Sequence, residues 1–256
     1  MIKAIFFDID GTLICHADGQ VPKGTQEALI QLREKGIKIC LATGRHINEI
    51  AKLPVSRFDF DGYITLNGQI CLDGDWQLFH DAPIHPEDSA QIAAIFAEKE
   101  VPAIIVERDR MYIDYVDQTV EQVQKAISTA LPQIGVYRGD KIYQFIVFAG
   151  DEKTRQLLKR LPHCKLTKWN DQAVDIIPAD GGKLVGIEKY LKLHGLRREE
   201  VMAFGDGNND VEMLRYCQIG VAMGNASPQV KASADFVTSA VDRDGIQLAL
   251  KHYGVL

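Results

Sequence analysis

The sequence predicts an α/β protein in which a parallel sheet, covered by helices, carries a separate inserted α+β unit. Strand patterns alternate with helix patterns near both ends of the chain, and this alternation is typical of crossover units and parallel sheets. Between residues 82 and 181, short strands follow one another across polar turns, which indicates antiparallel pairing. We therefore expect a core domain of residues 1–81 and 182–256 and an inserted domain of residues 82–181.

The composition is that of an ordinary globular protein. Of 256 residues, 46% are hydrophobic and 25% are charged, and the net charge is −6. This mild acidity argues against a sequence-independent nucleic-acid surface, although a local basic group could still attract a small anion. The five cysteines are scattered without a C-x-x-C pair, which favours a reduced, cytoplasmic protein. We expect neither a signal peptide nor a membrane span, and a monomer or homodimer.

The first predicted strand ends in two carboxylates. The run from Ile2 to Phe7 is apolar and β-prone, as in a parallel strand buried on both faces. Asp8 and Asp10 follow two positions apart, so in an extended chain both side chains project to one side. Gly11 then allows a sharp turn and the close approach of a ligand. Carboxylates this close repel one another, which is tolerable mainly when a cation lies between them.

A helix and a second strand follow. The pattern predicts an amphipathic helix over 22–35 and a buried strand over 37–42. This strand ends in Thr43 and Gly44, which could present a hydroxyl and a bare N–H to an anion at the edge where open α/β sheets bind ligands. A further strand over 63–66 leads into turn residues and a hairpin.

The inserted domain should contain three helices and several short strands. The helices are expected at 87–99, 118–130 and 152–161, and the strands at 103–107, 111–116, 143–148 and within 165–177. Prolines and glycines flank this segment and could serve as linkers. The alternation of strand and helix then resumes, from a helix at 184–194 to a final helix at 245–252.

Three further charged residues accompany this second part of the core. Lys183 opens a predicted helix, where its charge opposes the helix dipole unless an anion is near. A strand over 201–204 runs into Asp206, and Asp210 follows within the first helical turn. The spacing does not fit a calcium loop, which needs a ladder of ligands over twelve residues.

Several strings together resemble the haloacid dehalogenase-like (HAD) phosphohydrolases of the Cof type. They are FFDIDGTL at residues 6–13, TGR at 43–45, DIIPADGGKLVGI at 175–187, GDGNND at 205–210 and VAMGNASPQVKASADFVT at 221–238. The resemblance extends from Met1 to the last helix. It departs from the usual pattern at Gly182 and Leu184, on either side of Lys183.

The resemblance implies a HAD fold, with a Rossmann-like core and an inserted C2-type cap of class IIB. Between Asp10 and Thr43 there is room for only one helix and one strand, whereas the interval from Thr43 to Lys183 can hold a cap. It also implies roles for individual residues. The catalytic residues would be Asp8 as nucleophile, Asp10 as general acid/base, Thr43 and Lys183. The substrate would be bound by Ile9, Thr43, Gly44, Lys183 and Asn209. The metal site would comprise Asp8, the backbone carbonyl of Asp10, Asp206 and Asp210, the last as ligand or as a positioning residue.

Four carboxylates without histidine or cysteine favour a hard cation, and Mg²⁺ fits best. The expected function is Mg²⁺-dependent hydrolysis of small phosphomonoesters, such as sugar phosphates, through an aspartyl-phosphate. A phosphomutase or phosphotransferase on the same scaffold and a non-catalytic phosphometabolite sensor are the alternatives. A dehalogenase is disfavoured by Asp10, and an ion pump by the lack of apolar membrane segments.

Overall fold

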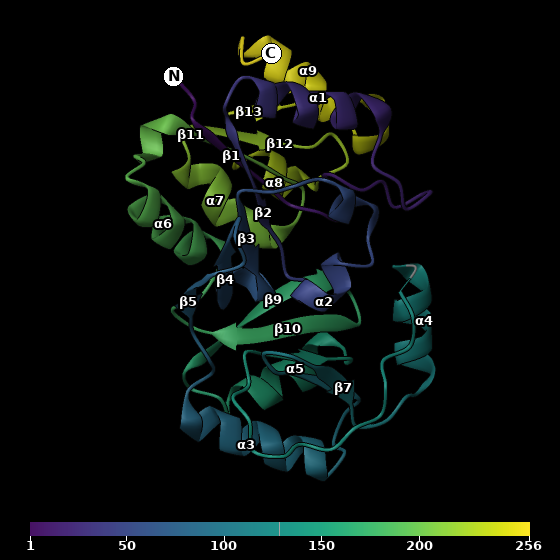
Figure 1. Cartoon of the computed structure of the whole chain (residues 1–256). Coiled ribbons are helices and arrows are strands. Elements are labelled where there is room, and N and C mark those ends of the chain that lie inside the picture. The colour runs from purple at the N-terminus through teal and green to yellow at the C-terminus, as the bar shows by residue number, and fades with distance from the viewer. Residues whose placement is uncertain (128) are drawn as a thin grey trace. The chain divides into compact units, whose positions relative to one another are not determined.

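The computed structural model describes residues 1–127 and 129–256. The chain divides into two compact units (Figure 1). Unit 1 comprises Met1–Asp81 and Gly182–Leu256, and unit 2 comprises Ala82–Gly181. In the described part of the chain, no helix is long and apolar enough to cross a membrane. All five cysteines are buried and unpaired.

Unit 1 is built on one eight-stranded sheet. Its spatial order is β13-β12-β11-β1-β2-β3-β4-β5. The strands are β1 (Ala4–Phe7), β2 (Lys38–Ala42), β3 (Gly62–Thr65), β4 (Ile70–Asp73), β5 (Leu78–Asp81), β11 (Val201–Gly205), β12 (Ile219–Ala222) and β13 (Phe236–Val237). From β13 to β3 all neighbours are parallel, whereas β4 and β5 are antiparallel, as expected for a hairpin.

Helices cover both faces of this sheet. They are α1 (Lys23–Glu34), α2 (Ile47–Ile50), α6 (Lys183–His194), α7 (Val211–Tyr216), α8 (Pro228–Lys231) and α9 (Gly245–His252). Residues of α1 and α9, which lie side by side (Figure 1), belong to one hydrophobic cluster, and residues of α6 and α7 belong to another.

The position of β1 in the sheet explains why its sequence does not alternate between apolar and polar residues. Ile5 and Phe7 belong to the cluster with α1 and α9, whereas Ala4 and Phe6 belong to the cluster with α6 and α7. All four side chains are fully buried. Since successive side chains point to opposite faces, a strand covered on both sides must be apolar throughout.

Unit 2 is an antiparallel sheet with its own core. Its strands run in the order β7-β6-β8-β10-β9. Their bounds are β6 (Ala103–Val106), β7 (Met111–Ile113), β8 (Gln144–Val147), β9 (Cys164–Asn170) and β10 (Ala173–Pro178), and the helices are α3 (Pro86–Ala97), α4 (Gln118–Ala126) and α5 (Asp151–Leu158). Apolar residues of α3 and α5 pack with the strands in one cluster.

The predicted α/β class is confirmed, and several element boundaries differ. The stretch 165–177 is two strands, β9 and β10, joined at Asp171 and Gln172. Strand β7 ends at Ile113 rather than at residue 116. The reason is local, because Asp114 Oδ1 accepts the N–H groups of Ala103 and Tyr115. The Asp114 N–H still donates to the carbonyl of Ala103 at 3.2 Å, so the side chain replaces one of the two backbone hydrogen bonds between these residues. The predicted helix 118–130 ends at Ala126, and Ser128 lies outside the described residues.

The packing of α1 provides a stability test with a matched control. Leu29 is fully buried in the cluster below α1, whereas its neighbour Ile30 is 52% exposed. Leu29→Ala should destabilise the protein by about 2–5 kcal/mol, because it removes buried methyl groups and leaves a cavity. Ile30→Ala should change stability by about 0.5 kcal/mol or less. Urea unfolding followed by circular dichroism measures both, and equal effects would contradict this packing.

Candidate active site

The carboxyl ends of neighbouring strands in unit 1 place the predicted site residues along one edge. Strands β11, β1 and β2 are adjacent, and they are followed directly by Asp206, Asp8 and Thr43. Backbone pairing continues one residue past β1, since Asp8 N–H donates to the carbonyl of Phe204 at 3.0 Å. The edge formed by parallel strand ends is where open α/β sheets bind ligands.

The turn after β1 needs the glycine at position 11. Gly11 has a φ of +80°, which L side chains rarely adopt, and a Cβ there would lie 2.2 Å from Asp206 Oδ2. Thr12 Oγ1 donates to Asp206 Oδ1 at 2.9 Å, and Asn225 Nδ2 donates to Asp206 Oδ2 at 3.1 Å. The turn therefore packs against Asp206 and fixes the direction of its carboxylate.

Lys183 joins two of the predicted carboxylates. Its Nζ donates at 2.6 Å both to Asp8 Oδ1 and to Asp210 Oδ1. The side chains of Lys183 and Asp210 are fully buried, and that of Asp8 is nearly so. Asp210 Oδ2 accepts the N–H groups of Asp206 and Gly207 at 2.9 and 2.8 Å. The Asp210 carboxylate thus binds both the lysine and the backbone of the loop that follows β11, here called the β11 loop (residues 206–210).

Burial and mutual repulsion shift the ionisation of these groups. Burial raises the pKa of Asp8 well above its ordinary value; Lys183 counteracts this, and Asp210 and Asp206 add to it. Burial and then the charge of Asp210 raise the pKa of Asp206 to about 7. Burial alone would lower the pKa of Lys183, but Asp210 and Asp8 outweigh it and the pKa lies above its ordinary value. The lysine is therefore a permanent cation.

Three carboxylates at this edge could hold a metal ion. Asp8, Asp206 and Asp210 each offer an oxygen, and these atoms all lie within 4.8 Å of one another. A set made only of oxygen ligands fits a hard divalent cation such as Mg²⁺. Asp210, however, has both oxygens engaged by Lys183 and the two N–H groups.

Asp10 lies outside this group of three carboxylates. Its oxygens accept hydrogen bonds from Arg45 Nε at 2.6 Å and Arg45 Nη2 at 2.8 Å. Arg45 also lies 3.5 Å from Glu49 at the start of α2. The Asp10 side chain is 35% exposed. Any contribution of Asp10 to a metal would therefore come through its backbone, as the sequence resemblance implies.

The remaining predicted residues line the same unit. Thr43 Oγ1 accepts the N–H of Arg45 at 3.1 Å, with Gly44 between them. Asn209 Nδ2 donates to Asn67 Oδ1 at 3.0 Å, which ties the β11 loop to the turn after β3. The Ile9 side chain is fully buried in the hydrophobic cluster. A contact of Ile9 with substrate would thus involve its backbone only.

Sequence reasoning missed two residues that organise this edge. The sequence allowed Arg45 either to cap the neighbouring helix or to pair with a carboxylate, and it pairs with Asp10. Thr12 and Asn225 both hold Asp206, and Asn225 also donates to the carbonyl of Gly11 at 2.9 Å. The available signal was position, because Thr12 lies inside the first motif and Asn225 follows the end of β12 in the last one.

The raised pKa of Asp206 predicts a pH-dependent stability in chelator. Between its unfolded value near 3.8 and about 7, the folded protein binds more protons at Asp206 than the unfolded chain does, so this group costs stability as the pH rises. Asp206→Asn removes that cost. In urea unfolding with EDTA, the variant should gain stability relative to the parent between about pH 5 and about pH 8. If the free energies of unfolding of variant and parent differ by the same amount at about pH 5 and at about pH 8, the raised pKa of Asp206 is contradicted.

Known proteins resemble this chain over almost its whole length. The family model for haloacid dehalogenase-like hydrolase matches residues 5–250. The Bacillus subtilis (strain 168) protein YkrA is 32% identical over 257 residues, which cover 99% of this chain and 98% of YkrA. The 5-amino-6-(5-phospho-D-ribitylamino)uracil phosphatase YitU of the same organism is 27% identical, over 97% of this chain and 96% of YitU.

Solved structures share the whole fold. The HAD subclass IIB sugar phosphatase BT4131 is 35% identical with a TM-score of 0.89, covering 99% of this chain and 100% of that one. BT1666, a HAD-superfamily phosphatase from Bacteroides thetaiotaomicron, is 31% identical with a TM-score of 0.88, covering 100% and 96%. Together with the family match, these similarities show that the chain belongs to the haloacid dehalogenase-like hydrolases, as a Cof-type phosphatase.

Proposed function

We propose that this phosphatase hydrolyses small phosphomonoesters with Mg²⁺ through an aspartyl-phosphate on Asp8. The observation that carries the proposal is the buried contact of Lys183 with Asp8 and Asp210, beside the carboxylate of Asp206. A carboxylate nucleophile and a phosphate ester repel one another. A fixed ammonium group and a metal site at the nucleophile lower that repulsion without any rearrangement during the reaction.

In this proposal Asp8, Asp206 and the backbone carbonyl of Asp10 hold the Mg²⁺. The ion would supply positive charge against the transferring phosphoryl group. Asp210 acts differently, because its two oxygens already bind Lys183 and the backbone of Asp206 and Gly207. Its role is to keep the lysine and the β11 loop in place.

The protein groups divide the reaction into two steps. An Asp8 oxygen attacks phosphorus, the bond from phosphorus to the alcohol oxygen breaks, and Asp10 gives its proton to that oxygen. Asp10 then takes a proton from water, which attacks phosphorus and releases phosphate and the Asp8 carboxylate. Thr43, Gly44 and Asn209, with Lys183, would bind the phosphoryl oxygens.

The pairing of Asp10 with Arg45 constrains the first step. Both Asp10 oxygens accept hydrogen bonds from the guanidinium group. Arginine stays protonated and only donates, so a proton on Asp10 must point away from the guanidinium group. We expect Arg45 to orient the Asp10 side chain and to stabilise its charged form, which acts as the base in the second step.

The proposed substrate class rests on the inserted unit and on the names of related proteins. Unit 2 is inserted between Thr43 and Lys183, and we propose that it is the cap that reads the alcohol part of the substrate. The related proteins are named as a sugar phosphatase and as a phosphatase of a phosphoribityl compound. Both names describe a phosphate on a small polyhydroxylated metabolite, and that class is proposed for this chain.

The mechanism predicts that activity requires both Mg²⁺ and Asp8. Phosphate release from a panel of sugar phosphates should be abolished by EDTA, restored by Mg²⁺ and absent in Asp8→Asn, because the amide cannot attack phosphorus. Asp75→Asn, at an exposed turn, is the matched control and should retain parental activity. Product analysis by NMR accompanies the assay. An isomerised phosphate ester without free phosphate would contradict hydrolysis and favour a mutase.

The role given to Asp10 predicts a smaller defect than loss of the nucleophile. Asp10→Asn should lower kcat by roughly 10²–10⁴, because proton transfer to the leaving oxygen and from water is lost. The defect in kcat/KM, which reports the step in which the alcohol leaves, should shrink for substrates with an acidic leaving group such as p-nitrophenol, which needs no proton. An equal defect in kcat/KM for alkyl and nitrophenyl phosphates would contradict a general-acid role.

A further inference from the structure

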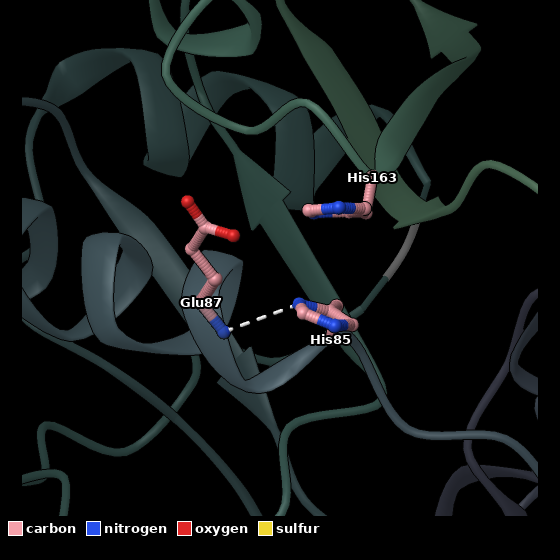
Figure 2. Close-up of side chains that lie close together, drawn as sticks. All are labelled: His85, Glu87 and His163. Carbon is pink, nitrogen blue, oxygen red and sulfur yellow. Dashed lines mark hydrogen bonds between the residues drawn. The ribbon is translucent and has the colours of Figure 1, made fainter.

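A second group of metal-binding side chains lies in unit 2 and takes no part in the proposed reaction. His85 caps the N-terminus of α3, Glu87 lies in its first turn, and His163 lies between α5 and β9. One ring nitrogen of each histidine and a carboxylate oxygen of Glu87 all lie within 4.8 Å of one another. Figure 2 shows the three side chains gathered around one space.

We propose that His85, Glu87 and His163 form a binding site for a divalent transition metal such as Zn²⁺. Two imidazoles and a carboxylate are ligands that suit Zn²⁺, Ni²⁺ and Cu²⁺, and they differ from the oxygen ligands that Mg²⁺ prefers. All three residues are exposed, so an ion can reach them from solvent. Water would complete the coordination.

Asp88 prepares His163 for this role. Its fully buried carboxylate accepts the backbone N–H of His163 at 2.9 Å through Oδ2, and Oδ1 lies 3.3 Å from His163 Nδ1. A proton on Nδ1 facing this carboxylate leaves the lone pair on Nε2 available to a metal. A carboxylate behind a ligating histidine commonly fixes the ring in this way.

The two imidazole rings lie against one another. The imidazoles of His85 and His163 stack with centroids 4.1 Å apart and an angle of 28° between their planes. His85 Nδ1 accepts the N–H of Glu87 at 3.3 Å, the contact drawn in Figure 2. That bond is long, so a cation competing for this nitrogen displaces a weak contact. Glu87 forms no ion pair with Lys or Arg among the described residues, which leaves its charge available.

The site joins the two ends of unit 2. His85 lies three positions after Ala82, where the unit begins. The carbonyl of His163 accepts the N–H of Ala179, two positions before the unit ends at Gly181. A metal bound to both histidines would therefore cross-link the segment that enters unit 2 with the segment that leaves it. Binding should stabilise the folded state by mass action.

The test is Zn²⁺ binding to the full chain at about pH 8, where imidazole is mostly neutral. Excess Mg²⁺ is present to occupy the carboxylates of unit 1. Calorimetry should show one more Zn²⁺ equivalent for the parent than for His85→Ala or His163→Ala, and Zn²⁺ should raise the unfolding temperature of the parent more than that of either variant. His16→Ala, which removes an exposed histidine of unit 1, is the matched control and should behave as the parent does.

Cu²⁺ gives a second readout that the carboxylate site cannot mimic. Its EPR spectrum should show hyperfine coupling to two nitrogens in the parent and in the control, but not in either histidine variant. Glu87→Gln keeps both rings and should retain the nitrogen coupling with weaker Zn²⁺ binding, so the test holds even if a histidine variant folds poorly in circular dichroism. Equal Zn²⁺ stoichiometry in parent and variants, or a Cu²⁺ spectrum without nitrogen coupling, would overturn the proposal.

Discussion

The candidate active site depends on one buried ammonium group held between two carboxylates. Lys183 contacts Asp8 and Asp210 at equal distances of 2.6 Å, and it is fully buried. A buried charge that loses its partner costs about 3–5 kcal/mol. Each of the three residues is therefore needed by the other two, and this mutual requirement holds the Asp8 carboxylate in one place.

The same edge of the sheet carries more negative than positive charge. Asp8, Asp206 and Asp210 face a single lysine at this edge, and the pKa of Asp206 is raised to about 7 as a result of burial and repulsion. This excess of negative charge favours the uptake of protons or cations at the site. A divalent ion bound here would relieve that imbalance, and under the proposed function it would also lower the repulsion of an anionic phosphoryl group.

The sequence predicted the parts of the site that strand ends position. Asp8, Thr43 and Asp206 follow apolar strands, and parallel strands must end at a common edge, so their proximity could be expected from the pattern alone. The sequence could not show which partner each carboxylate takes. Arg45 binds Asp10, and Asn225 binds Asp206, through side-chain directions that follow from loop conformations. The end of β7 was missed for the same reason, because the Asp114 side chain accepts the N–H groups of Ala103 and Tyr115 there.

The chain offers metal ions two kinds of ligand in two separately packed units. Unit 1 presents carboxylates alone, and unit 2 presents two imidazoles and one carboxylate. Nitrogen and oxygen sites alike bind Zn²⁺ more tightly than the hard ion Mg²⁺ at equal concentration, so affinity alone would not keep Zn²⁺ away from Asp8. Selection must come from abundance and from ligand type. Imidazoles raise the preference for Zn²⁺ in unit 2 far more than carboxylates do in unit 1, and scarce Zn²⁺ would therefore fill the histidine site first.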